Sequence, residues 1–356
     1  KSKLRRGGIK MLASIWFILW GVLWAVYFML DGFDLGIGTL MPFLAKNETD
    51  KRIMYNAMGP FWNGNEVWLI AAGGVTFAAF PTTYAVMFSG LYSALMLILF
   101  SLIFRGVSIE FRGKVDHPRW KNGWDICLTV SSFLPALLLG VAFANIFQGI
   151  PIDEAGIFRG NLFSLLNPYG LLGGLFFVLM FLVHGALWLA VKSEGDLHER
   201  AASLSSKLWL GLAVVAVAFL VATWFYTRLY DNYLQNPLFY MVPIVLIPLG
   251  TVAALVMIRL YVAKAQWWKA WFSSCGVIVG ATLFGVVGLY PNLLPSSLNP
   301  AFSLTVYNSS SSPLTLKIML VVALIFVPIV IAYQSWVYHF FSGKVEPGDL
   351  LEEEAY

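Results

Sequence analysis

The sequence predicts an all-α integral membrane protein. Of its 356 residues, 59% are hydrophobic and only 12% are charged, and the mean hydropathy is +0.75. A soluble chain carries about 25% charged residues, because its surface must be covered with polar groups. The deficit indicates that most of this chain is solvated by lipid. It excludes a nucleic-acid-binding protein, a disordered chain and a secreted disulfide scaffold.

Long apolar runs predict the membrane-spanning helices. A bilayer core of about 30 Å needs about 20 apolar residues in a helix, whereas strands would alternate apolar and polar residues. Eight runs meet this length: residues 12–30, 85–104, 126–147, 169–191, 208–227, 238–258, 270–289 and 318–338. A ninth run, from residue 67 to about residue 82, is shorter and rich in glycine, and Pro81 supplies its turn. This run must link its neighbours, so we predict nine spans.

The distribution of basic residues predicts the orientation, since Lys and Arg accumulate in cytoplasmic loops. The odd-numbered loops and the tail hold 15 of them, against Arg159 and Arg228 in the loops on the other side. We therefore expect the N-terminus outside and the C-terminus in the cytoplasm. One membrane domain would cover residues 11–341, followed by an acidic cytoplasmic tail at residues 342–356.

Residues 1–10 conflict with this orientation, because they place five basic residues on the predicted outer side. Residue 1 is not Met, whereas Met11 directly precedes the first span. We expect the native chain to begin at Met11 and residues 1–10 to be an extension. A signal peptide fits less well, because the first span is long and no small-residue cleavage site follows it.

Two carboxylates close the first predicted span. Ionisable residues in or near a span are costly, so each is a candidate functional residue. Asp31 and Asp34 are three residues apart and share one helical face. In a poorly hydrated place they repel each other, which favours binding of a proton and suits groups that load and pass protons. Alternatively, they simply mark the cytoplasmic interface.

The second predicted span opens with Trp-Asn-Gly-Asn-Glu-Val-Trp, which begins at Trp62. Asn65 can cap this helix, and Glu66 in its first turn is favoured by the helix dipole. Capping explains the polar residues without any chemistry. It does not explain Trp62 and Trp68, six residues apart around the cluster, although interfacial tryptophans are common.

Two further ionisable residues stand out. Glu110 follows the third span, and Lys114 one turn later could form an ordinary surface pair with it. His184 lies in an apolar run, with seven residues between it and Lys192, where it could ligate haem, relay protons or bond a neighbouring helix. The other histidines and the two cysteines lack metal-ligand spacing, so we expect no metal site.

Six stretches in fixed order resemble subunit II of the bacterial cytochrome bd quinol oxidase family. They are DGFDLG at 31–36, WNGNEVWL at 62–69, FRGV at 104–107 with EFR at 110–112, NPYGLL at 167–172, YP at 290–291 with PSS at 295–297, and LTL at 314–316. The match runs from about residue 11 to residue 341. Within these stretches Trp62, Asn65, Trp68 and Arg105 are motif residues to which we assign a structural role.

The resemblance implies two four-helix bundles and a peripheral helix in the bacterial cytoplasmic membrane. It also implies a partner subunit I of homologous fold, which carries two b-type haems, one d-type haem and the quinol site. This chain would then bind no haem, act as a scaffold and support proton uptake from the cytoplasm. Some members hold a structural quinone, and lipid and a small accessory subunit are further candidate partners.

The family's proton-path carboxylates correspond by resemblance to Asp34 and Glu110. Some members place a third acid after the first tryptophan of the second stretch, where this chain has Asn63. Glu66 stands where those members have an amide, about one helical turn later on a similar face. We therefore expect Asp31, Asp34, Glu66 and Glu110 to carry protons, with Glu66 in place of the acid missing at Asn63.

Two alternatives come from other functional classes. A proton-coupled transporter would show inverted repeats and broken helices around a site at the membrane midplane, whereas the acids here gather at the predicted cytoplasmic ends. A membrane cytochrome acting alone would need a second axial ligand near His184. The resemblance favours a subunit of an oxygen-reducing quinol oxidase that is not catalytic by itself.

Overall fold

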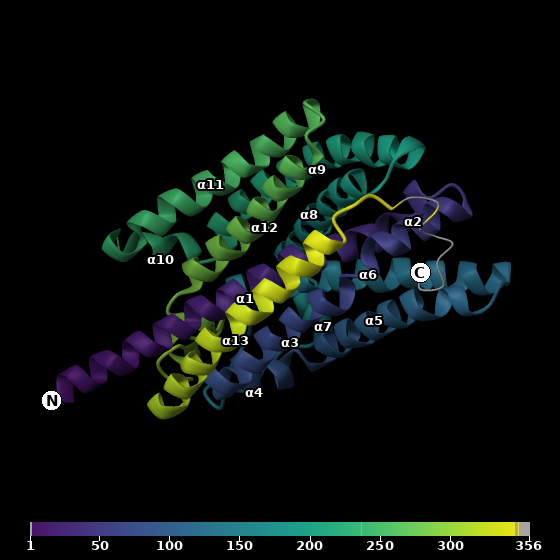
Figure 1. Ribbon diagram of the computed structural model, residues 1–356. Coiled ribbons are helices and arrows are strands. Elements are labelled where there is room, and N and C mark those ends of the chain that lie inside the picture. The colour runs from purple at the N-terminus through teal and green to yellow at the C-terminus, as the bar shows by residue number, and fades with distance from the viewer. Residues whose placement is uncertain (1, 236, 346–347, 349–356) are drawn as a thin grey trace.

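The computed structural model describes residues 2–235, 237–345 and 348. The acidic residues of the predicted tail, 346–354, lie outside the described residues. The described chain is almost entirely helical, with long helices running roughly along one direction (Figure 1) and one small two-stranded sheet.

Eight helices are long and apolar enough to cross a membrane. They are Lys10–Leu44, Tyr92–Lys114, Pro118–Gln148, Pro168–Lys192, Gly195–Tyr226, Leu246–Ala263, Trp267–Leu289 and Pro313–Phe340. Each overlaps one of the eight predicted runs, which confirms them. As elements, they belong to α1 (Ser2–Leu44), α5 (Tyr92–Phe111) with η1 (Arg112–Lys114), α6 (Pro118–Gln148), α8 (Pro168–Lys192), α9 (Gly195–Tyr226), α11 (Pro237–Ala263), α12 (Trp267–Leu289) and α13 (Pro313–Phe340).

The first helix is longer than its predicted span. α1 continues ten residues beyond Asp34 to Leu44, so the two aspartates lie inside the helix and do not close it. Its apolar sequence continues past residue 34, and a helix can extend as long as neighbouring helices cover it. A short helix, α2 (Glu48–Met58), follows; the Asn47 side chain caps it by accepting a bond from the Asp50 amide.

The region of the predicted ninth span forms α3 (Trp62–Ala79), and Phe80 separates it from α4 (Pro81–Gly90). Pro81 occupies the first position of α4, where its missing N–H costs nothing. The predicted third span does not form one helix from residue 85. It breaks at Leu91 between α4 and α5, and α5 then continues to Phe111.

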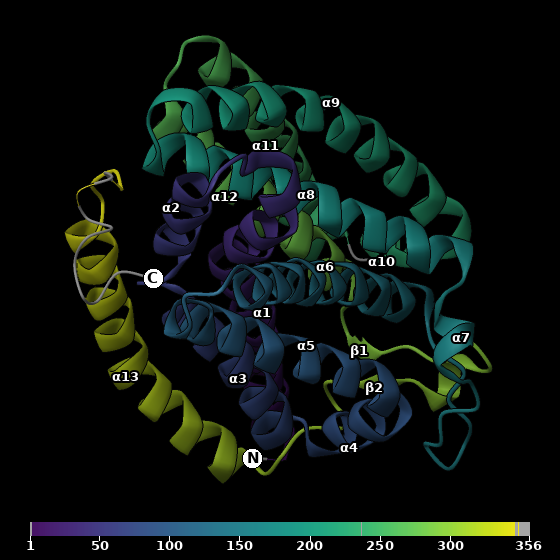
Figure 2. The ribbon, with the colours of Figure 1, turned by 90° about the vertical axis from the view of Figure 1, so that its right-hand side faces the viewer.

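α1 is the central helix and contacts α3, α6, α8 and α12. Its approach to α8 depends on glycine: a Cβ at Gly36 would lie 2.0 Å from the Phe181 carbonyl oxygen, and one at Gly185 would lie 2.7 Å from the Ile37 nitrogen. Figure 2 shows α3 to α6 on one side of the molecule, α8 to α12 on the other, and α13 along an edge. The fold therefore brings residues of α1, α3, α5 and α13 together.

The two ends of the helices differ in charge. One end carries most of the lysines and arginines of the described chain. There, ion pairs join segments far apart in sequence, namely Lys51 with Asp125, Arg200 with Asp50 and Lys344 with Glu194. We call this end the basic end.

The opposite end carries α7 (Leu162–Leu165), α10 (Leu229–Gln235), η2 (Pro300–Phe302) and the antiparallel pair β1 (Asn292–Leu294) and β2 (Leu304–Thr305). Its sheet lies in the uncharged loop at residues 290–313.

Candidate functional site

A buried ion cluster joins α1, α3 and α5. The guanidinium of Arg105 donates to both carboxylate oxygens of Asp31, from Nη1 at 3.0 Å and from Nη2 at 2.6 Å. The same Nη2 donates to Glu66 at 2.5 Å. Arg105 and Asp31 have no exposed surface, whereas the Glu66 side chain is 22% exposed. One arginine therefore binds two carboxylates, and of these three side chains only Glu66 has exposed surface.

Asp34 belongs to a second, adjoining network. Asn65 Nδ2 donates to Asp34 Oδ2 at 2.8 Å, and the Tyr338 hydroxyl donates to Asn65 Oδ1 at 2.8 Å. The bond from Tyr338 fixes the orientation of the Asn65 amide, so its N–H group must point at the carboxylate. The other oxygen, Asp34 Oδ1, is buried without a hydrogen-bond partner. A proton on this oxygen would need no rearrangement of the bonded groups.

The cluster contains more carboxylates than basic groups. Three carboxylates, from Asp31, Asp34 and Glu66, accompany the single guanidinium of Arg105. Full ionisation would leave a net charge of about −2 in a mostly dry region, which is costly unless protons or further partners compensate. The arrangement is therefore suited to holding a proton.

The short segment that opens α3 does not act as predicted. Its N-cap is Phe61, without a side-chain cap bond, and the helix begins at Trp62. Asn65 therefore lies inside the helix, and its side chain bonds Asp34 and Tyr338, so the capping interpretation is wrong. Asn63 is exposed at the start of α3.

The two tryptophans of α3 hold neighbouring helices. Trp62 packs on Gly106 of α5, where a Cβ would lie 2.9 Å from its ring. Trp68 Nε1 donates to Gln334 of α13 at 2.7 Å, and Gln334 Nε2 donates to the Gly64 carbonyl at 2.6 Å. Both tryptophans therefore have packing roles around the cluster.

Glu110 does not join the cluster. It lies on α5 with an exposed side chain, and no ion pair joins it to Lys114 in the described structure. Arg105 directly follows the predicted run 85–104 and counts among the 15 basic residues of the odd-numbered loops and tail, but it lies inside α5 and is buried. An arginine at the end of an apolar run was a signal for a buried ion pair. Nothing in the sequence linked Tyr338 to Asn65, because 273 residues separate them.

A second ion cluster fastens α2 to the start of α6. Arg112 donates to Glu48 at 2.8 Å and to Asp125 at 2.6 Å, and Lys51 contacts Asp125 at 2.8 Å. Burial raises the pKa of Glu48, but the hydrogen bond and charge of Arg112 and the charge of Lys121 outweigh it, so that this pKa lies below its usual range.

Comparison with known sequences settles the family. The sequence model described as cytochrome bd terminal oxidase subunit II matches residues 12–341. The chain belongs to this family. It is 38% identical to the cytochrome bd-I ubiquinol oxidase subunit 2 of Escherichia coli (strain K12), over 96% of this chain and 97% of that protein. It is 37% identical to the cytochrome bd ubiquinol oxidase subunit 2 of Bacillus subtilis (strain 168), over 94% and 97%.

A solved structure shares the fold. The structure of bd oxidase from Geobacillus thermodenitrificans matches with a TM-score of 0.75 and 16% identity, covering 93% of this chain and 98% of that one. The family is thus shown by sequence, and the helical architecture is shared with a bd oxidase structure.

The cytochromes of this family raise the question of whether this chain can hold haem. His184 is fully buried; its Nε2–H donates to the Met29 carbonyl at 2.9 Å, and its Nδ1 lies 2.6 Å from the Ser274 hydroxyl. The ring also stacks on Trp271, with 5.3 Å between centroids. With both nitrogens and one ring face occupied, His184 does not fit axial ligation. Within the described residues, no group of three or more His, Cys, Asp or Glu side chains could hold a metal ion.

Proposed function

We propose that this chain is the second subunit of an oxygen-reducing quinol oxidase in the bacterial cytoplasmic membrane. It would serve as the scaffold for a haem-bearing subunit I and contribute to proton uptake from the cytoplasm. Family membership supports the complex, and the buried cluster of Asp31, Asp34, Glu66 and Arg105 is the observation that supports a proton role. A small accessory subunit stays a prediction.

The proposed proton route begins at Glu66, the cluster's partly exposed carboxylate. A proton would pass from Glu66 to the Asp31 carboxylate across the shared Arg105, and then to Asp34, whose Oδ1 is free to accept it. Waters would bridge the gaps, since no direct bond joins Asp34 to the other acids. Glu110 is exposed, so we place its carboxylate at the rim of the route, where it would exchange protons with water or with subunit I. Asn63 is also exposed, but its amide cannot titrate, so it would carry no proton itself.

Topology is a further part of the proposal. We place the basic end in the cytoplasm, with the N-terminus outside, and we take α3 as the ninth crossing. Arg105 is buried and Lys317 lies near the start of α13 at the opposite end, so the contrast in basic residues becomes 14 against 3. The excess of basic residues at the basic end remains after both changes.

The helices α1, α3, α5 and α6 would form one bundle, α8, α9, α11 and α12 the other, and α13 the peripheral helix. The domain would cover residues 11–341.

We place the two b-type haems and the d-type haem in subunit I, because both ring nitrogens of His184, which is buried in α8, are engaged. A structural quinone would fit the groove of about 560 Å³ between α12 and α13. Trp268, Trp271 and Phe272 offer ring faces there, and Trp271 Nε1 is a buried donor without a partner. A quinone carbonyl could accept that bond. Trp271→Phe should then release the quinone found in lipid extracts of the purified complex.

The proton role is tested by Asp34→Asn in the assembled oxidase. Asn65 can still donate to the new amide oxygen, so assembly should be kept. We expect quinol-driven oxygen consumption to fall about tenfold, or about 1.4 kcal/mol in the barrier, while anaerobic haem reduction by quinol keeps its parental rate. Glu199→Gln, an exposed acid at the same end, is the control. Parental oxygen consumption in Asp34→Asn would refute the role.

A further inference from the structure

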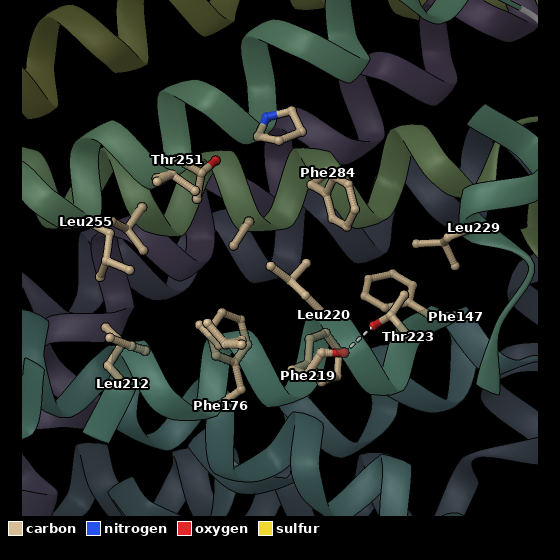
Figure 3. A pocket seen from close by; sticks show the side chains of 17 residues that line it. Phe147, Phe176, Leu212, Phe219, Leu220, Thr223, Leu229, Thr251, Leu255 and Phe284 are labelled. Carbon is tan, nitrogen blue, oxygen red and sulfur yellow. Dashed lines mark hydrogen bonds between the residues drawn. The ribbon is translucent and has the colours of Figure 1, made fainter. Parts of the chain in front are cut away.

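Two adjoining cavities lie away from the ion cluster. The first, of about 230 Å³, lies between α9, α11 and α12 and is almost wholly apolar. Figure 3 shows Leu212 and Leu255 at one end of it and Phe147 and Leu229 at the other. An engineered apolar cavity of about 150 Å³ stays dry and binds benzene, so this larger one is suited to hydrocarbon.

The two hydroxyls in its wall do not change this chemistry. Thr223 donates to the Phe219 carbonyl and Thr251 to the Ile247 carbonyl, both at 2.7 Å. Each hydroxyl hydrogen is therefore used within its own helix. A water in the cavity would lack the two to four polar partners that hold buried water.

The second cavity, of about 650 Å³, is polar and lies at the end of the molecule opposite the basic end. The end of α6, the start of α10 and the segment 289–303 line it. Phe147 and Leu229 line both cavities. The two cavities therefore adjoin at these residues, which is the arrangement that an amphiphile with its headgroup in one cavity and one hydrocarbon chain in the other would need.

The polar cavity carries one cation and one anion that no described side chain pairs. Arg228 and Asp231 are exposed residues that both line it, three residues apart, and neither side chain forms a hydrogen bond or ion pair within the described structure. The other arginine of this end behaves differently, because Arg159 pairs with Asp153 at 2.6 Å. Arg228 and Asp231 are thus available together to a ligand that carries both charges.

We propose that the two cavities form one site for a phospholipid with a zwitterionic headgroup that carries a phosphate and a primary ammonium. Arg228 would bind the phosphate, since guanidinium matches phosphate oxygens, and Asp231 would bind the ammonium. One acyl chain would fill the apolar cavity. An uncharged quinone ring would leave both charges unmatched, and an anionic lipid without an ammonium would leave Asp231 facing negative charge. With the proposed topology, the lipid belongs to the outer leaflet.

The test uses the complex with subunit I, purified in mild detergent and analysed by native mass spectrometry. We expect one phosphatidylethanolamine to stay bound per complex. The fraction of complexes that retain phosphatidylethanolamine should be at least tenfold lower for Arg228→Gln than for the parental protein. This fraction should also fall for Ala281→Leu, which fills the apolar cavity. Arg159→Gln is the matched control and should retain phosphatidylethanolamine. After delipidation, phosphatidylethanolamine should raise the melting temperature of the parental complex more than phosphatidylglycerol does.

Asp231→Asn separates the two charges. It should retain phospholipid but bind phosphatidylethanolamine and phosphatidylglycerol equally. Three outcomes would overturn the proposal: a delipidated parental complex that does not distinguish the two lipids, retention of phosphatidylethanolamine by both Arg228→Gln and Ala281→Leu, or recovery of quinone in place of phospholipid from this site. Because Ala281→Leu leaves the charges intact, misfolding of the arginine variant would not decide the test.

Discussion

Arg105 is the residue on which the buried charges depend. Its guanidinium is the single cation bonded to Asp31 and Glu66, and it comes from a different helix than either. A buried ion pair adds little net stability when intact, because desolvation offsets the attraction, but removing one partner leaves an uncompensated charge. The residue therefore ties α1, α3 and α5 into one arrangement.

Arg105→Gln is expected to prevent assembly. Removing one partner of a buried pair costs about 3–5 kcal/mol, so the membrane content of the complex should fall below a tenth of the parental level by size-exclusion chromatography. Adding Asp31→Asn should restore part of it, because one unpaired charge disappears. Arg119→Gln, an exposed arginine in the first turn of α6, is the control. Normal yield of the single variant would show that the pairing is dispensable.

Glu66→Gln tests the entrance of the proposed proton route. Arg105 keeps Asp31, so the fold should survive with normal haem content, but an amide cannot titrate. Quinol-driven oxygen consumption should fall by about tenfold, which corresponds to about 1.4 kcal/mol in the barrier. Adding Asn63→Asp should recover part of the rate, since residue 63 lies on the exposed side of the same helix start. A parental rate in the assembled single variant would leave Glu66 only a structural ion-pair role.

At the scale of elements, α13 is held by polar contacts near both of its ends. Near its start, Trp16 Nε1 donates to the Leu316 carbonyl at 2.9 Å. The Lys192 ammonium donates to the carbonyls of Phe341 and Gly343, and the Val345 amide bonds the Lys192 carbonyl. Within the last turns of α13, Gln334 and Tyr338 donate hydrogen bonds to residues of α3. The middle of the helix faces outward. These few polar contacts therefore position Tyr338 against the Asn65 amide that bonds Asp34.

Lys192→Met should release this end of the chain. Methionine has similar length but no donors, so the two carbonyls lose their bonds and the amides of residues 341–345 should exchange with deuterium at least tenfold faster. Lys207→Met, an exposed lysine of α9, should leave exchange unchanged. Unaltered protection in Lys192→Met would mean that packing of α13 alone holds the segment.

The attachment of α2 should depend on acid pH. The pKa of Glu48 lies below its usual range because its bonds and charge attraction with Arg112 and Lys121 outweigh burial. Its contribution is therefore complete above the unfolded value of about 4.3 and is lost as the pH falls through the folded pKa. Hydrogen exchange in α2 should accelerate below about pH 4. Glu48→Gln should remove most of this acid-induced change; an unchanged pH profile would contradict it.

At the scale of the whole molecule, His184 is the histidine buried deepest among the described helices, and hydrogen bonds engage both of its ring nitrogens. Expressed without subunit I, it should show no haem absorbance, because both nitrogens of His184 are engaged. The optical spectrum of the purified subunit checks this, and the spectrum of the whole complex serves as the positive control. Stoichiometric haem in the lone subunit, lost on His184→Ala, would contradict it and favour a cytochrome that acts alone.

Several properties of this protein followed from its sequence alone. The membrane class, the eight apolar runs and the break before Pro81 were predictable because hydropathy and proline stereochemistry act over a few neighbouring residues. Family membership was predictable because six motifs occur in fixed order. Asp31, Asp34 and Glu66 could also be singled out as candidate functional residues, since a charge in an apolar setting is costly wherever it lies.

Only the tertiary structure decided which partners those charges have. Arg105 directly follows a predicted apolar run, yet it is buried inside α5. Asn65 looked like a helix cap, yet it bonds Asp34. Glu110 is exposed and does not join the buried cluster. α1 extends beyond Asp34 because α8 covers it, and two glycines that are 149 residues apart in sequence, Gly36 and Gly185, make this contact possible. Which face of a helix is buried depends on the neighbours that pack against it, and local sequence does not specify those neighbours.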